Sequence, residues 1–152
     1  MHETAGGRKK SCIRGSLKAL AALSELGPEY WEQASCRRLI GYFLDREGIY
    51  RRSELRVVAN KDVQTMIFPF HWRAGLVEVL FHLSRMGYGD DSWLRRAWAL
   101  LASKSTSEGR HILEWTPSQS AWKVGRPGAA NKWLTLYALL AQKAAGRSVN
   151  EE

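Results

Sequence analysis

The sequence predicts an all-α domain that is built as an array of αα-hairpins. Apolar residues recur at three- and four-residue intervals in several segments. Glycines follow these segments where a helix is expected to end. The order helix, glycine, helix, glycine occurs twice, with equivalent glycines at positions 27 and 87. Stacked hairpins bury their inner faces only against neighbours, so we expect a short array to leave an open end.

Length and composition favour one globular domain. The 152 residues are 45% hydrophobic and 25% charged. We expect a mobile basic tail at residues 1–11, a helical domain at 12–146 and a second tail at 147–152. The net charge of +8 is compatible with an acidic partner or an anionic surface. Nucleic-acid binding is not favoured, because aromatic and basic residues do not alternate and no zinc knuckle or Gly-rich RNA-binding signature is present.

The first two helices follow from apolar spacing and from their end signals. A helix is predicted to begin at Ile13, with Ser11 as N-cap, and to end at the Gly27-Pro28 stop. A second helix is predicted over residues 30–46, with Gly48 after it. The pattern breaks over residues 49–67, where the apolar run is too short for a confident strand, so we expect a long connection there.

The central stretch is the motif Phe-Pro-Phe-His-Trp at residues 68–72 and the segment that follows it. Pro69 lacks an amide proton and biases the residue before it away from helix, so we predict a helix over 73–86 rather than through the motif. Asp90 or Asp91 is expected to cap the next helix, which runs to about residue 103. After irregular segments, a last helix over 130–144 is predicted to have a broad inward apolar face, comprising Trp133, Leu134, Leu136, Tyr137, Leu140 and Ala141.

These motifs resemble a known family. Residues 36–50, the Phe-Pro-x-x-Trp motif at 68–72 and the segment Gly-Arg-Pro-Gly-Ala-Ala-Asn-Lys-Trp-Leu-Thr-Leu-Tyr-Ala-Leu at 125–139 carry the resemblance. They are similar to the C-terminal part of bacterial squalene-cyclase-like and prenyltransferase-like proteins, which have the terpenoid cyclase α/α-toroid fold. The resemblance extends from about residue 13 to residue 142 and implies a partial toroid.

The catalytic motifs of that family are incomplete here. The cyclase acid motif Asp-x-Asp-Asp has only Asp90-Asp91 as a counterpart, and adjacent carboxylates at a helix start serve the cap and the helix dipole. The family's Gln-Trp repeats are absent. Neither Cys12 nor Cys36 has a spacing to histidine that predicts zinc. The sequence therefore assigns no catalytic residue, no metal and no cofactor.

Several residues are nevertheless candidates for a binding site. The tryptophans are expected to pack in the core or to line an apolar cavity. Glu78 and His82 lie four residues apart on one predicted helix, as a structural pair or as a proton-transfer dyad. Lys132 at a helix start suits a phosphate, as in a prenyl diphosphate. The candidate binding residues are His71, Trp72, Glu78, His82, Glu114, Trp115, Trp122, Lys132 and Trp133.

Two functional interpretations remain open. The first is a non-catalytic helical module for binding or scaffolding, in which a protein partner or a homo-oligomer completes the toroid. The second is an isoprenoid-binding enzyme with a Trp-lined pocket for an apolar ligand. A filled interior with an exposed apolar flank would favour the first, and a cavity with a buried carboxylate opening into it the second. No signal peptide or spanning segment is evident, so a cytoplasmic protein is expected.

Overall fold

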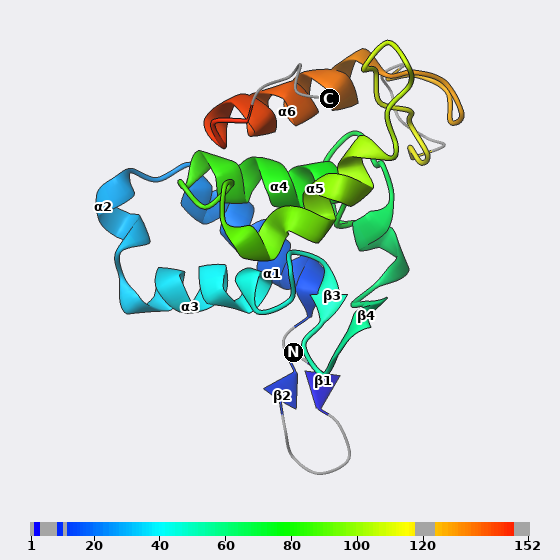
Figure 1. Cartoon of the computed structure of the whole chain (residues 1–152). Coiled ribbons are helices and arrows are strands. Elements are labelled where there is room, and N and C mark those ends of the chain that lie inside the picture. The colour runs from blue at the N-terminus through cyan, green and yellow to red at the C-terminus, as the bar shows by residue number, and fades with distance from the viewer. Residues whose placement is uncertain (1, 4–8, 11, 118–123, 148–152) are drawn as a thin grey trace.

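Helices make up most of the regular structure (Figure 1). The computed structural model describes residues 2–3, 9–10, 12–117 and 124–147. Within them lie the α-helices α1 (Ile13–Ser24), α2 (Pro28–Trp31), α3 (Ala34–Leu44), α4 (Leu76–Arg85), α5 (Arg95–Ala102) and α6 (Lys132–Ala144), and the 3-10 helices η1 (Lys61–Gln64) and η2 (Ser92–Leu94). Two antiparallel strand pairs complete the fold: β1 (His2–Glu3) with β2 (Lys9–Lys10), and β3 (Tyr50–Arg51) with β4 (Glu54–Val58).

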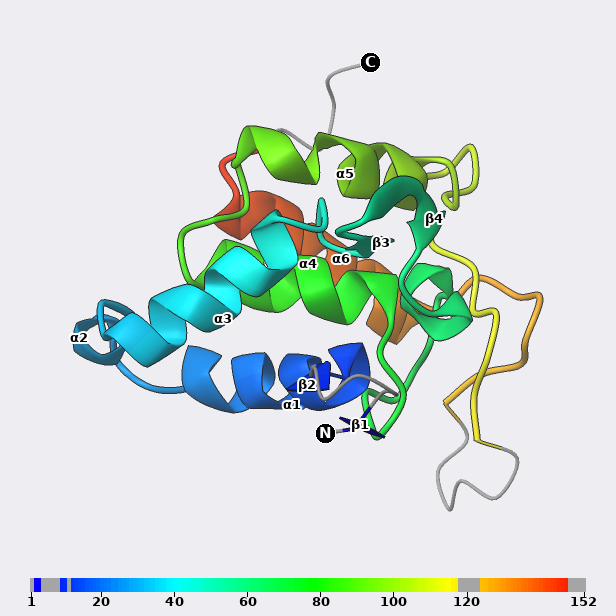
Figure 2. The ribbon, with the colours of Figure 1, turned by 90° about the horizontal axis from the view of Figure 1, so that it is seen from below.

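Helix α4 lies at the centre of the molecule. It packs against α1, α5, α6 and η1, and Figures 1 and 2 show it between α1 and α6. Its apolar side chains are almost completely buried, including Leu76, Val79, Leu80 and Leu83. The sequence predicted this burial, because apolar residues occupy more than one face of the helix.

The prediction of an all-α hairpin array and partial toroid is wrong. Helices do not pair simply in sequence order, because α4 packs most extensively against α6, which lies about fifty residues further along the chain. Residues of the expected long connection form the β3–β4 hairpin, with Tyr50 opposite Val58 and Arg51 opposite Glu54. The fold is therefore a mixed one, in which helices surround α4 and a small antiparallel sheet lies beside them.

The hairpin escaped prediction because its strands are short. In β4, Leu55 and Val57 are half-buried whereas Glu54 and Arg56 are exposed, which is the alternation of a strand with one covered face. Such a segment is marginal alone and depends on its partner strand and on packing. Its partner β3 is only two residues long, so the period of two is not visible there.

Several helix boundaries also differ from prediction. The helix predicted over 30–46 divides into α2 and α3. Helix α4 begins at Leu76 rather than at residue 73, because the segment before it is irregular and packs against other parts of the chain. In this segment Phe68 N donates to Trp115 O at 3.3 Å, and Gly75 lies against Ile67 and the Thr65 carbonyl. Asp91 acts as a cap, since its Oδ1 accepts from Trp93 N at 2.9 Å, but it caps η2, which leads into α5. Gly87 ends α4 with a φ of 85°, whereas Gly27 is the N-cap residue of α2 and α1 ends earlier, at Ser24. The proposed cap Ser11 lies outside the described residues.

Helix α6 has a covered face and an uncovered one. Leu134, Ala138 and Ala141 are buried against the core. The predicted inward face was too broad, because Trp133, Leu136 and Leu140 remain 40%, 43% and 41% exposed. We call these three residues the α6 stripe.

Shortening a buried side chain of the central helix α4 should greatly lower the stability of the fold. Leu80 is fully buried in α4, so Leu80→Ala is expected to lower the free energy of unfolding by about 2–5 kcal/mol. Leu26, which follows α1 and is 44% exposed, supplies the control. Leu26→Ala should change the free energy of unfolding by less than about 0.5 kcal/mol. Urea denaturation followed by circular dichroism measures both. Equal effects of the two substitutions would show that α4 is not the core.

Candidate functional site

The residues singled out from the sequence do not converge on one pocket. Glu78 and His82 face α1 from the buried helix α4. His71, Trp72 and Trp115 gather around the irregular segment before α4. Lys132 and Trp133 lie in the first turn of α6. Trp122 lies outside the described residues.

Buried polar groups join α1 to α4, and we call them the polar seam. Lys18 Nζ donates to Glu78 Oε1 at 2.5 Å, and Ser24 Oγ lies 2.7 Å from His82 Nδ1. Because the Ser24 hydroxyl proton goes to the Ala21 carbonyl at 2.8 Å, Nδ1 of His82 acts as the donor to Oγ. Glu78 and His82 thus pair with α1 and not with each other.

Burial shifts the ionisation of both α4 residues. Loss of solvent raises the pKa of Glu78, and the hydrogen bond and charge of Lys18 oppose this shift. Burial lowers the pKa of His82 to about 4, so its imidazole is neutral at pH 7. The second carboxylate oxygen of Glu78 has no hydrogen-bond partner among the described residues. The polar seam is a structural joint in which Glu78 and His82 are desolvated.

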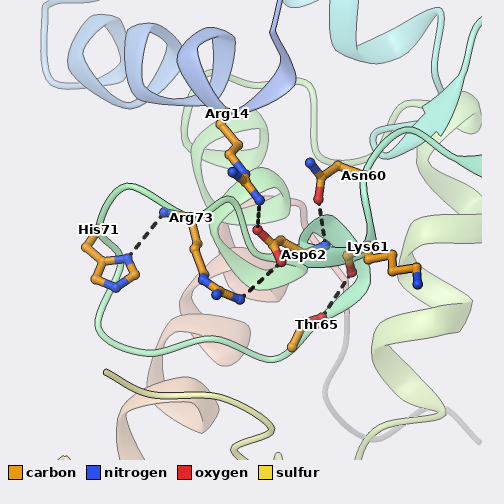
Figure 3. A network of polar contacts seen from close by, with 7 residues as sticks. All are labelled: Arg14, Asn60, Lys61, Asp62, Thr65, His71 and Arg73. Carbon is orange, nitrogen blue, oxygen red and sulfur yellow. Dashed lines mark hydrogen bonds and ion pairs between the residues drawn. The ribbon is translucent and has the colours of Figure 1, made fainter. Parts of the chain in front are cut away.

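A second polar cluster centres on Asp62 in η1 (Figure 3). Arg14 from α1 pairs with Asp62 Oδ2, and Arg73 donates to Oδ1 at 3.2 Å. Asp62 N in turn donates to the Asn60 side chain at 2.9 Å, which fixes the start of η1. One carboxylate therefore holds two guanidinium groups from distant parts of the chain.

Aromatic rings surround these arginines. The guanidinium carbon of Arg73 lies 5.0 Å from the Trp72 ring centroid and 4.1 Å from that of Trp115. That of Arg14 lies 5.1 Å from Trp72, and His71 stacks on Trp72 with centroids 5.7 Å apart. Trp72 itself remains 58% exposed. Cations and one exposed aromatic surface therefore occur together here.

Glu114 has a structural role. Its Oε2 accepts from Met66 N at 2.7 Å, and its Oε1 accepts from Lys104 Nζ at 2.6 Å. The neighbouring His111 is buried, and burial lowers its pKa. These contacts tie residues 104–115 to the segment before α4.

The start of α6 borders a surface hollow of about 660 Å³. Asn131 caps the helix, because its Oδ1 accepts from Trp133 N and Leu134 N at 3.0 Å each. Two of the first helix amides are thus already occupied, which weakens the case for a phosphate there. The hollow is lined by Arg110, Val124, Gly125, Ala130, Asn131, Lys132, Thr135, Leu136 and Leu139.

An aromatic cluster connects α6 to the irregular segment. The Phe68 ring is stacked with Trp133, with centroids 6.0 Å apart and an interplanar angle of 8°. Tyr137 packs edge-on against Phe70 and Phe81, with centroids 4.8 and 5.1 Å apart. Trp133 thus contributes to packing through one ring face and keeps part of its surface open.

Across the described ranges, no group of three or more His, Cys, Asp or Glu side chains is arranged to hold a metal ion. The same residues include no helix that is long and apolar enough to cross a bilayer. Cys12 and Cys36 are free thiols.

Residues with prominent contacts were missing from the sequence-based set. Arg14 and Lys18 of α1 and Glu25 at its C-cap each pair with a residue of η1 or α4: Asp62, Glu78 and Arg85 respectively. In the sequence these three residues are spaced by four and by seven positions, which indicates that they lie on a common helical face. The partners, 48 to 60 residues away, leave no such signal.

Comparison with known proteins supplies no relative: no protein-family model, curated protein or solved structure matches the chain. The resemblance to squalene-cyclase-like proteins therefore depends on the residue pattern alone. Function must be argued from the described surface.

The neutral state of His82 predicts a pH-dependent stability. Its pKa of about 4 in the folded chain lies below the unfolded value of about 6.5. The unfolded state thus binds more protons between these values, and stability falls as the pH falls through this window. As the pH falls through this window, the free energy of unfolding of the wild type should fall by roughly 3 kcal/mol more than that of His82→Gln. The glutamine retains a hydrogen-bonding group for Ser24.

Urea denaturation of both proteins at pH 4, 5, 6 and 7 measures this difference. Glu78 acts in the opposite direction, because its raised pKa favours the folded state at low pH, and His111 acts in the same direction as His82. Both are present in each protein, so the comparison isolates His82. If the free energies of unfolding of the two proteins changed with pH in parallel, His82 would not be a buried neutral imidazole.

Proposed function

We propose that the chain is a non-catalytic binding module whose α6 stripe receives an acidic amphipathic segment of a partner protein. The exposure of Trp133, Leu136 and Leu140 carries the proposal. Exposed apolar surface that is contiguous and bordered by polar residues is typical of interaction sites.

The stripe has the spacing of a helix-recognition surface. Its members occupy positions i, i+3 and i+7 of α6, so they lie along one face. The hollow adjoins this face through Leu136 and Leu139. An amphipathic helix places anchors at the same intervals and can lay its apolar side against such a surface.

Charge favours an acidic partner over a second copy. Arg110 and Lys132 line the hollow, and Lys143 is exposed in the last turn of α6. Glu108, 3.4 Å from Arg110 Nε, offsets one of these charges. Two copies that met at this face would bring like charges together in a protein of net charge +8.

The enzyme interpretation has less support. Its acid would have to reach the ligand, but the described residues that line the hollow include no carboxylate. The buried Glu78 instead lies at the polar seam and pairs with Lys18. Trp72, Trp115 and Trp133 are also not among the residues that line the hollow.

Binding of a designed peptide tests this proposal. The probe is a helical peptide with leucines at i, i+3 and i+7 and glutamates elsewhere, labelled for fluorescence anisotropy. The double substitution Leu136→Asp and Leu140→Asp should weaken its binding at least about tenfold, because it replaces apolar contacts by like charges. A peptide with lysines in place of the glutamates should bind wild type at least about tenfold more weakly.

The matched control is Leu26→Asp, since Leu26 is also exposed but lies after α1. It should change binding less than about twofold, and both variants should keep the unfolding free energy within about 1 kcal/mol. Failure of the acidic peptide to bind wild type would overturn the proposal. So would equal losses in the Leu26 variant and the stripe variant.

A further inference from the structure

A different surface from the α6 stripe has the features of a small-ligand site. It comprises Arg14 and Lys18 of α1 with His71, Trp72 and Arg73 of the segment before α4, and we call it the Trp72 site. Figure 3 shows Arg14 and Arg73 approaching Asp62 from two directions, with His71 beside Arg73. We propose that the Trp72 site binds a nucleoside monophosphate, with the base on the Trp72 ring and the phosphate beside the arginines.

The first support is the exposed and pre-organised indole. Trp72 is 58% exposed although two guanidinium groups and the His71 ring contact it. Trp93, 55% exposed, has no ring or cation contact of this kind among the described residues. A ring that neighbours already hold in place loses little freedom when a base stacks on it.

The second support is the excess of hydrogen-bond donors. Nε of Arg14, Nε of Arg73 and Nε2 of His71 are buried and have no partner among the described residues. His71 Nδ1 accepts from Arg73 N at 3.3 Å, so a neutral His71 has its proton on Nε2. The cluster around Asp62 therefore has more donors than acceptors, and arginine in particular suits phosphate.

The third support is the local charge. Arg14, Lys18 and Arg73 face two carboxylates, Asp62 and Glu78, which leaves one positive charge in excess when both are ionised. The side chains of Arg14 and Lys18 are each 34% exposed. The charges of Lys18 and Arg73 also lower the pKa of His71, after the larger effect of burial, so both cations lie near this ring. The partly exposed side chains of Arg14 and Lys18 are therefore accessible to a phosphate from solvent.

The ligand class follows from these features together. A simple anion would use the cations but not the indole, and an uncharged aromatic would use only the indole. A single-stranded nucleic acid is bound along a series of stacking rings and cations, whereas this site offers one exposed ring. One base joined to one phosphate matches what is present.

Calorimetric titration with adenosine 5′-monophosphate tests the proposal. Adenosine alone and inorganic phosphate alone should each bind at least about tenfold more weakly than the nucleotide, because each loses one half of the contacts. A second titration with a six-residue oligodeoxyadenylate distinguishes a free nucleotide from a nucleic acid. Affinity equal to that of the mononucleotide identifies a free nucleotide as the ligand, and binding more than tenfold tighter that still requires Trp72 identifies nucleic acid as its source.

Matched variants locate the binding. Trp72→Ala should weaken nucleotide binding about tenfold or more, and Trp93→Ala less than about twofold. Arg14→Gln should weaken it about fivefold, whereas Arg37→Gln, at an exposed ion pair with Glu32 on another part of the surface, should not. Circular dichroism verifies that each variant is folded. Absence of nucleotide binding at millimolar concentration, or an equal loss with Trp93→Ala, would overturn the proposal.

Discussion

The nearly complete enclosure of α4 is the constraint on which the rest of the structure depends. A helix covered by α1, α5, α6 and η1 must be apolar on most of its surface, and α4 is. It nevertheless carries Glu78 and His82, whose burial would be costly without hydrogen-bond partners. Lys18 and Ser24 supply those partners, so the polar seam selects the face and position at which α1 can dock.

The same constraint explains why both proposed binding surfaces lie on the outside. The side chains around α4 are mostly buried and apolar, and Glu78 and His82 each have one hydrogen-bond partner on α1, whereas the hollow beside α6 lies at the surface. Helix α6 covers α4 with Leu134, Ala138 and Ala141, and no described element covers the α6 stripe. The Trp72 site likewise forms where the irregular segment leaves α4 and meets α1. Both proposed sites therefore lie at the surface of the fold, at the α6 stripe and at the Trp72 site, and not in the core.

Local signals in the sequence predicted local features well. The apolar period of α1 and α4, the cap at Asp91 and the glycines after α3 and α4 were read correctly because each depends on a few adjacent residues. Long-range pairing was not predictable: the docking of α6 on α4, the short β3–β4 hairpin and the sharing of Asp62 by Arg14 and Arg73 join distant residues. Apolar spacing also placed Leu136 and Leu140 inward, because periodicity identifies an apolar face but not what covers it.

Native-state hydrogen exchange tests the central role of α4 most directly. Amides of residues 80–86 should exchange only through global unfolding, with opening free energies equal to the unfolding free energy, because most residues of this helix are buried. Amides of α6 and α3, which have exposed faces, should exchange through smaller openings. If α6 or α3 were protected as strongly as α4, or if α4 opened locally, the enclosed helix would not be the element that organises this fold.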